Sequence, residues 1–445
     1  MAPDADRFHS PGRVIAGAFA LAIALGSALL SLPFATESGD RASLLDAVFT
    51  STSAVCVTGL ITVDTGTYWS TFGQVVILAL FQIGGLGIMT VASLMVVLIS
   101  RRLGLRARLV AQAQARTMTT RDVGRVVRNV VIFTLAIELV AAVVLVGRLL
   151  VDTDMSVGRA IYDGVFHAVS AFNNAGFSLN PDSMIRYAED EWIMLTISVA
   201  VIIGGLGFPV VFELLRSWRH PQTWSVTTRV TVIVSAALLV GGTVILLAVE
   251  NDNPDTLGSA SGHHLVMAAF FSTMTRTAGF NAIDTGAMTP EGLLFTDVMM
   301  FIGGGSASTA GGIKVTTFGL LAVVLWAEMR GDTRVDIGLR QIPLDNQRQA
   351  LAVALLGIVG VAAGTFALLF LSDFGVDQVL FEAISALGTV GLSTGITPDL
   401  PDSAKWLIIV MMYVGRLGPL TLASALALRQ RERRYERPTE RITIG

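Results

Sequence analysis

The stretch that decides the fold is Ser385-Ala386-Leu387-Gly388-Thr389-Val390-Gly391-Leu392-Ser393, a run of small, hydroxyl-bearing and apolar residues around a central glycine. Similar stretches occur three more times along the chain. Their central glycines are Gly59, Gly176, Gly279 and Gly391, separated by 117, 103 and 112 residues. Similarity at a nearly constant spacing predicts one structural unit that is repeated four times.

Two short strings mark each unit. The first contains the central glycine and reads Val57-Thr58-Gly59-Leu60, Asn173-Asn174-Ala175-Gly176-Phe177, Arg276-Thr277-Ala278-Gly279-Phe280-Asn281 and Gly388-Thr389-Val390-Gly391-Leu392-Ser393. The second follows 25 to 29 residues later and reads Ile83-Gly84-Gly85-Leu86-Gly87, Ile203-Gly204-Gly205-Leu206-Gly207, Ile302-Gly303-Gly304-Gly305-Ser306 and Val414-Gly415-Arg416-Leu417-Gly418. Because two separate strings repeat in step, we interpret the repeat as genuine.

The composition is that of a membrane protein. Of 445 residues, 53% are apolar and 15% are charged, whereas an average soluble domain has about 25% charged residues. Mean hydropathy is +0.66. These values exclude a disordered chain, a nucleic-acid-binding protein and an ordinary soluble enzyme. The single cysteine, Cys56, excludes an internal disulfide framework and a cysteine-based metal cluster.

Apolar runs of two lengths alternate along the chain. About 20 residues are needed to cross a bilayer as a helix. Eight runs reach that length: 14–34, 72–100, 129–151, 192–215, 228–249, 291–327, 349–371 and 404–428. Four shorter segments lie between them: 43–56, 159–173, 262–275 and 376–388. Their length suits re-entrant helices, and each ends at one of the four central glycines.

Charge predicts the orientation of the eight crossings. Arginines gather in the connections around 101–128, 216–229 and 330–348 and in the tail 429–441, whereas acidic residues predominate in the alternate connections. Because basic loops stay on the cytoplasmic side, we expect both termini in the cytoplasm and the four short segments entering from outside. Multi-pass insertion in the plasma (inner) membrane follows.

The predicted fold is all-α. It has four helix–pore-helix–loop–helix repeats, which give eight transmembrane helices and four re-entrant pore loops around a pseudo-four-fold pore. The repeats are expected at 1–100, 101–218, 219–340 and 341–445; the third has a broken last helix and the fourth carries a basic cytoplasmic tail.

The four loops are candidate ion sites. Non-helical backbone within a membrane must line a water-filled path or be buried in protein, and carbonyl oxygens can replace the hydration shell of a potassium ion. The candidate ion-binding residues of this selectivity filter are Val57, Thr58, Gly59, Asn174, Ala175, Gly176, Thr277, Ala278, Gly279, Thr389, Val390 and Gly391. We expect the side chains of Asn174, Asn281 and Ser393 to brace the loops. Arg276, which precedes the third loop, is expected to brace that loop.

The fourth loop looks like a degenerate form of the potassium-channel string T-V-G-Y-G. The second glycine of that string is absent from every repeat, where Ile61, Ser178, Asn281 and Ser393 stand instead. We therefore expect modest discrimination among potassium, rubidium and sodium. The Gly-Gly strings of the second register are interpreted as helix-packing sites, as small residues in membrane helices commonly are.

With these strings the chain resembles the membrane subunit of the Ktr/Trk/HKT superfamily of cation transporters, and most closely a KtrB-type potassium uptake subunit. The resemblance covers nearly the whole chain. It implies potassium translocation, a homodimer of pores and a cytosolic nucleotide-binding regulatory ring of the KtrA type. Sodium stimulates transport in several members, so sodium is a second candidate ion; no organic cofactor and no nucleic acid are expected.

The resemblance also assigns a gate. The superfamily has a gating loop where the glycine-serine run breaks the sixth apolar run, and glycine disfavours helix there by about 1 kcal/mol per residue. The alternative is a loop packed statically against its neighbours. The candidate gating residues are Gly303, Gly304, Gly305, Ser306, Ala307, Ser308, Thr309, Ala310, Gly311, Gly312, Lys314 and Arg416.

Three charged residues at membrane depth have alternative interpretations. Lys314 either anchors the loop to carbonyls or a carboxylate, or extends toward the cytoplasm. Arg416, where the other repeats have glycine, either lies by the ion path and repels cations or forms an interior salt bridge. Glu138 either pairs with an arginine of a neighbouring helix or is protonated.

The competing function classes are an enzyme or pump and a secondary transporter. No phosphate-binding loop, zinc motif, phosphorylation motif or Ser/His/Asp constellation is visible, so an enzyme is not expected. A sodium- or proton-coupled cation transporter with less strict ion preference remains the alternative function. Four parallel repeats differ from the inverted repeats of many such transporters.

Overall fold

The protein is described by a computed structural model over residues 11–102, 120–152, 155–259 and 262–428. The helices are α1 (Pro11–Leu30), α2 (Leu44–Val55), α3 (Thr71–Arg102), α5 (Thr120–Asp152), α6 (Val157–Asn173), α7 (Glu191–Leu206), α8 (Phe208–Ser217), α9 (Val226–Glu250), α10 (His264–Met274), α11 (Pro290–Phe301), α12 (Val315–Arg330), α13 (Leu344–Leu371), α14 (Val376–Gly388) and α15 (Asp402–Leu428). A hairpin of two short strands, β1 (Asp336–Ile337) and β2 (Arg340–Gln341), follows α12. The described chain is therefore mostly helical.

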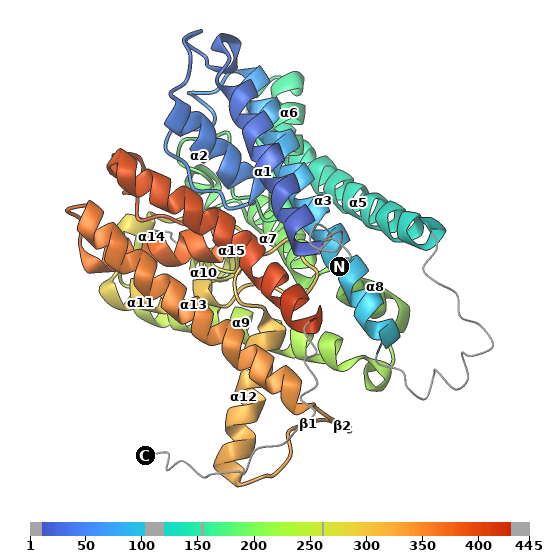
Figure 1. Ribbon diagram of the computed structural model, residues 1–445. Coiled ribbons are helices and arrows are strands. Elements are labelled where there is room, and N and C mark those ends of the chain that lie inside the picture. The colour runs from blue at the N-terminus through green and yellow to red at the C-terminus, as the bar shows by residue number, and fades with distance from the viewer. Residues whose placement is uncertain (1–10, 103–119, 153–154, 260–261, 429–445) are drawn as a thin grey trace.

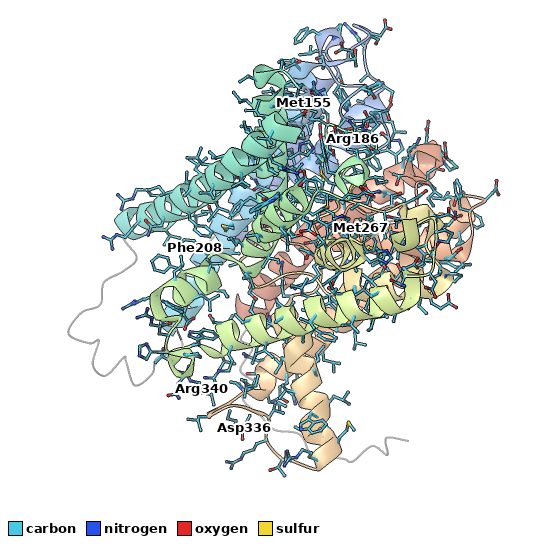
Figure 2. All side chains as sticks on the ribbon, turned by 180° about the vertical axis from the view of Figure 1, so that it is seen from behind. Met155, Arg186, Phe208, Met267, Asp336 and Arg340 are labelled. Atoms are coloured by element: carbon cyan, nitrogen blue, oxygen red, sulfur yellow. The ribbon has the colours of Figure 1, made fainter. Side chains whose placement is uncertain are left out.

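Single turns of 3-10 helix join several of these elements. They are η2 (Pro33–Ala35), η3 (Ile185–Tyr187), η4 (Pro221–Thr223), η5 (Leu257–Ser259), η6 (Thr285–Ala287) and η7 (Thr397–Asp399). Helix α12 and the hairpin project from one end of the molecule (Figure 1). In Figure 2, Asp336 and Arg340 lie at that end, whereas Met155 and Arg186 lie at the opposite one.

Five described helices are long and apolar enough to cross a membrane, namely α1, α3, α5, α9 and α13. The pair α7 and α8, which meet at an angle of 101°, is long and apolar enough for a sixth if the two helices count as one broken span. The expectation of one continuous helix over 192–215 is therefore wrong. Gly207 has a φ of 89°, outside the helical region, and Pro209 is the second residue of the next helix and has no amide hydrogen to donate, so the hydrogen-bond ladder cannot continue.

Two expected crossings remain, at 291–327 and 404–428. The run 291–327 consists of α11 and α12, separated by an irregular segment over 302–314, as the glycine-serine run predicts. The run 404–428 lies in α15, of which the side chains beyond residue 418 are outside the described part. The number of eight crossings stays a prediction, as does the orientation; the basic tail 429–441 is also outside the described residues.

The four short segments form helices close to the predicted positions. They are α2, α6, α10 and α14, and each is followed by buried, non-helical backbone. Each of them carries a fully buried aromatic side chain; Phe49, Phe172, Phe271 and Phe381 are all at most 1% exposed. The short helices thus form the interior of the fold.

Apolar side chains also cover the outside of the long helices. Leu139 on α5 and Phe366 and Phe370 on α13 are 64%, 75% and 86% exposed. A soluble monomer rarely exposes so many large apolar groups. This surface fits a hydrocarbon environment, and it agrees with the membrane assignment from composition.

Candidate ion pathway

The four loops after the short helices share one backbone geometry. In each loop a residue with positive φ is followed, two positions later, by a glycine with positive φ. The pairs are Val57 (56°) with Gly59 (96°), Asn174 (57°) with Gly176 (70°), Thr277 (68°) with Gly279 (74°), and Thr389 (49°) with Gly391 (97°). Positive φ is uncommon outside glycine, so its recurrence at equivalent positions marks a common conformation.

The same four glycines bring the loops into a closed ring. A Cβ atom at Gly59 would lie 2.6 Å from the carbonyl oxygen of Ala175, and one at Gly176 would lie 2.8 Å from that of Ala278. The series continues from Gly279 to the Val390 oxygen at 2.7 Å and from Gly391 to the Thr58 oxygen.

The carbonyl beside each glycine thus belongs to the middle residue of the next loop, and the last loop returns to the first. A side chain would prevent this close approach of backbones, which is why glycine stands there. We call the loops at residues 57–59, 174–176, 277–279 and 389–391 the loop ring.

Hydrogen bonds to the short helices hold the loop ring in place. The amides of Thr58, Ala175 and Val390 each donate a 2.8 Å bond to the carbonyl of the serine five residues earlier. All three serines also act through the side chain, and Ser170 Oγ donates to Phe177 O at 2.8 Å. Ser53 Oγ accepts from Gly59 N, and Ser385 Oγ accepts from Gly391 N, each at 3.1 Å. The third loop differs, because Ala278 N bonds Met274 O at 3.1 Å.

The glycine-serine segment over 302–314 has defined backbone contacts. Gly303 N donates to Ile313 O at 2.9 Å, and Val315 N donates to Gly304 O at 3.0 Å, so the two ends of the segment meet. Gly305 N also donates to Gly205 O, at 2.7 Å. The segment is therefore closed on itself and tied to the end of α7.

This segment contacts three of the four loops of the ring. Thr309 Oγ1 donates to Asn174 Oδ1 at 2.8 Å, and Gly311 N donates to Thr277 Oγ1 at 3.1 Å. A Cβ at Gly311 would overlap Thr389 Oγ1. The candidate gating residues and the candidate filter residues are thus in direct contact.

Lys314 anchors the segment from its far end. Its Nζ donates to the carbonyl of Ala310 at 2.6 Å and to that of Gly311 at 3.4 Å. The expectation that Lys314 binds carbonyls is confirmed, and an extended side chain that reaches for the cytoplasm is excluded.

Arg416 is buried without a visible counter-charge. It is 5% exposed, and its Nε and Nη2 atoms have no hydrogen-bond partner among the described residues. Lys314 and Cys56 lie within electrostatic reach of its guanidinium. The interior salt bridge of the alternative interpretation is not found in the part of the chain that the structure describes.

Glu138 has amide partners. Its two carboxylate oxygens accept from Gln82 Nε2 at 3.1 Å and from Asn173 Nδ2 at 3.0 Å. Of the two alternatives, pairing with an arginine is not found within the described ranges. The network joins α3, α5 and the end of α6, one residue before the loop ring begins.

The Gly-Gly strings serve helix packing, as predicted. A Cβ at Gly84, Gly204 or Gly415 would overlap a carbonyl oxygen at the end of a short helix, namely that of Val55, Phe172 or Leu387 respectively. In each case α3, α7 or α15 lies directly against the end of the helix that leads into the ring.

The side chains expected to brace the loops do so in different ways. Asn174 accepts from Thr309, Asn281 Nδ2 donates to Ile283 O at 3.3 Å, and Ser393 bonds Glu382. Arg276 reaches α9, where Nη1 and Nη2 donate to the carbonyl and hydroxyl oxygens of Ser235 at 3.2 and 3.0 Å. It thus fixes the start of its loop to a neighbouring helix.

Two residues behind the loops were not identified from the sequence. Glu382 on α14 accepts hydrogen bonds from Ser393 Oγ and from Thr397 Oγ1, the second at 2.9 Å. On α6, His167 Nε2 lies 3.0 Å from Ser178 Oγ. The sequence indicates them only by position, because each polar residue stands nine residues before the central glycine of its loop.

Comparison with known proteins assigns a family. The sequence profile of the TrkH family, described as "Cation transport protein", matches residues 13–434. The Ktr system potassium uptake protein B of Bacillus subtilis is 41% identical over 419 residues, covering 94% of this chain and 93% of that protein. The protein of the same name from Vibrio alginolyticus is 37% identical, with 96% and 94% covered.

Two further similarities extend this result. The potassium/sodium uptake protein NtpJ of Enterococcus hirae is 34% identical, over 98% of this chain and 97% of that protein. The crystal structure of the potassium transporter TrkH from Vibrio parahaemolyticus has the same fold, with a TM-score of 0.72 at 21% identity; the match covers 96% of this chain and 87% of that one. The chain belongs to the TrkH family of cation transport proteins, which are transporters and not enzymes.

Proposed function

We propose that this protein is a potassium uptake subunit and that potassium passes through the loop ring. The observation that carries the proposal is the closed series of contacts from Gly59 through Gly176 and Gly279 to Gly391 and back. Four loops with the same backbone geometry around one axis offer carbonyl oxygens at similar depth, which is the chemistry that replaces a hydration shell. The names of the related uptake proteins support the same ion.

The loop ring is the centre of four repeats in this proposal. Each repeat supplies one short helix, one loop and two flanking crossings, so that eight crossings and four re-entrant loops surround a pseudo-four-fold pore. The repeat boundaries are 1–100, 101–218, 219–340 and 341–445. Support comes from the matching φ values in the four loops and from the equivalent packing of Gly84, Gly204 and Gly415. The plasma membrane, with both termini in the cytoplasm, is the proposed location.

The filter residues of the proposed pore are those of the loop ring. Each loop has one glycine, so there are fewer tightly shaped sites than in a string with two glycines. We therefore propose modest preference for potassium over rubidium and sodium. Competitive flux measurements test this point, and exclusion of sodium at the level of a potassium channel would contradict it.

The segment over 303–312 is the proposed gate, together with Lys314 and Arg416. It is supported by the hydrogen bonds of Thr309 and Gly311 to the loop ring. A segment that bonds directly to the filter loops obstructs the path on one side and must move for ions to pass. Arg416 is proposed to add a positive charge near the path, where it repels cations.

The proposed assembly has further components. The relatives are called proteins of a "Ktr system", which describes transport by more than one chain. We propose a homodimer of pores and a cytosolic nucleotide-binding ring of the KtrA type as regulator. We also propose that sodium stimulates transport. The name of the related potassium/sodium uptake protein NtpJ supports a role for sodium.

Gly279→Ser tests the filter. At this position a side chain would meet the Val390 carbonyl, and φ is 74°, so the substitution distorts the ring. We expect a raised half-saturation for potassium in cells that lack their own uptake systems. Gly395→Ser is the matched control, because Gly395 also has a positive φ (92°) but no atom within 4 Å of a Cβ there.

Equal uptake by wild type and Gly279→Ser, at equal amounts in the membrane, would count against the filter assignment. The same assay tests the alternative function. Uptake that ceases when the sodium or proton gradient is collapsed, while the potassium gradient is kept, would favour a coupled secondary transporter.

A further inference from the structure

The fourth short helix, α14, carries a carboxylate where hydrocarbon or a small side chain is expected. Glu382 is fully buried, with an exposed fraction of 0%. No arginine or lysine lies within ion-pairing distance of it in the ranges described. A buried carboxylate without a cation is costly, so its partners indicate what it does.

All the partners of Glu382 lie in the chain just beyond the loop ring. Ser393 Oγ donates to one carboxylate oxygen and Thr397 Oγ1 donates to the other at 2.9 Å. Two hydroxyl donors within five residues thus converge on one side chain, and the first of them stands two residues after Gly391. Glu382 thereby ties the outer side of the fourth loop to its own helix.

The second repeat has a similar device with different chemistry. His167 is 5% exposed, and its Nε2 accepts from Leu179 N at 3.3 Å and lies 3.0 Å from Ser178 Oγ. Its Nδ1 lies 2.8 Å from Asp163 O, one helical turn earlier. Ser178 and Ser393 stand two residues after their glycines, so the two braces join equivalent positions.

The other two repeats lack a brace from this helix position; the first loop is tied instead by Thr62 Oγ1, which donates to Asp46 Oδ1 on α2 at 2.6 Å. Thr50 and Phe270 occupy the positions of His167 and Glu382, and the Thr50 hydroxyl has no partner among the described residues. The order of contacts in the loop ring places the second and fourth loops opposite one another. Braces from the position nine residues before the central glycine therefore act along one diagonal of the ring.

We propose that Glu382 is a positioning residue for ion discrimination: it fixes the outer side of the fourth loop, and so sets the preference for potassium over sodium. The proposal rests on the filter function proposed above. A loop whose carbonyls are held at fixed separation discriminates by ion size, and a loop that relaxes accepts the smaller ion more readily. Glu382 itself does not touch the ion.

The test compares potassium and sodium flux in liposomes that contain the purified chain. Glu382→Leu removes the acceptors at similar length, and loss of hydrogen bonds to a charged group should lower the potassium-over-sodium ratio about tenfold. Glu382→Gln should stay within about threefold of wild type, because the hydroxyls of Ser393 and Thr397 can donate or accept.

Glu250→Leu is the matched control. Glu250 is also 0% exposed and accepts from hydroxyl groups of Thr256 and Thr289, at 2.8 and 2.6 Å, but it lies at the end of α9 and bonds none of the residues that directly follow a loop of the ring. Its substitution should reduce the amount of folded protein and leave the flux ratio unchanged. The ratio does not depend on how much protein folds, so it separates positioning from general stability.

A folded Glu382→Leu variant with the wild-type flux ratio overturns the proposal. Should that variant not fold, Ser393→Ala decides, because it removes one donor on the loop side and leaves Glu382 in place; an unchanged ratio there overturns the proposal equally. Wild-type protein without potassium flux would instead contradict the proposed function. Wild-type flux with unchanged variants would contradict only the role of Glu382.

Discussion

Thr309 Oγ1 donates a 2.8 Å hydrogen bond to Asn174 Oδ1, which joins the glycine-serine segment over 302–314 to the loop at residues 174–176. Both residues are 1% exposed. The same hydroxyl lies 3.3 Å from the carbonyl of Phe172, at the end of α6. One side chain thus links the proposed gate to the proposed filter, and the consequences can be measured.

Thr309→Val should raise potassium flux in the absence of a regulatory partner. Valine keeps the shape and removes the hydroxyl, and a typical hydrogen bond contributes about 1 kcal/mol, which corresponds to roughly a fivefold shift toward the open state. Flux into liposomes measures it. Ser306→Ala is the control, since Ser306 Oγ bonds only Thr316 Oγ1, at 2.9 Å, away from the loop ring. Equal flux in all three proteins would contradict the coupling.

Deletion of residues 305–311 should raise potassium flux further and weaken control by any regulatory chain. The deletion removes the groups that bond Asn174 and Thr277. Uptake in cells, normalised to the amount of protein in the membrane, is the measurement. Unchanged flux in a well-expressed deletion would support a statically packed loop.

Neutralising Arg416 should increase the maximum rate of transport. In Arg416→Gln the positive charge near the proposed path is removed, while the side chain retains donors. The maximum rate of potassium uptake should rise, with less effect on half-saturation. Arg330→Gln is a suitable control, because the Arg330 side chain is 63% exposed at the end of α12. A loss of folded protein in Arg416→Gln alone would indicate a structural role.

Gly84→Ala should destabilise the fold, whereas Gly87→Ala should not. A methyl group at Gly84 would overlap the Val55 carbonyl, and overpacking of this kind costs about 1–3 kcal/mol. No atom lies within 4 Å of a Cβ at Gly87, three residues along the same helix, where alanine gains up to about 1 kcal/mol of helix propensity. Thermal unfolding in detergent distinguishes the two, and equal midpoints would contradict the packing role.

Local sequence was sufficient for the short helices and for the broken sixth run. Segments 43–56, 159–173, 262–275 and 376–388 became α2, α6, α10 and α14, because the length of an apolar run limits what it can cross. The run Gly303 to Gly312 interrupts the helix since glycine disfavours helix at several consecutive positions. Both results depend on residues near one another in the chain.

The bend at Gly207 shows where local information ends. Gly87 and Gly207 close identical strings, Ile-Gly-Gly-Leu-Gly, yet α3 continues through the first and α7 ends before the second. At Gly207 a Cβ would lie 2.6 Å from the Ser306 carbonyl, so the glycine-serine segment occupies the adjacent space. Pro209 is the second residue of the next helix. The contact from a distant segment and this proline together distinguish the two strings.

The sequence by itself determined the membrane class, the fourfold recurrence and the twelve residues of the loops, because periodicity and local backbone preference are written in neighbouring positions. Only the tertiary structure decided which loop meets which. Gly391 packs against Thr58 from the other end of the chain, and Glu138 and Glu382 have partners that no sequence spacing indicates. Such contacts depend on how whole helices pack. A buried polar group forms hydrogen bonds with the donors that lie next to it once the helices are packed.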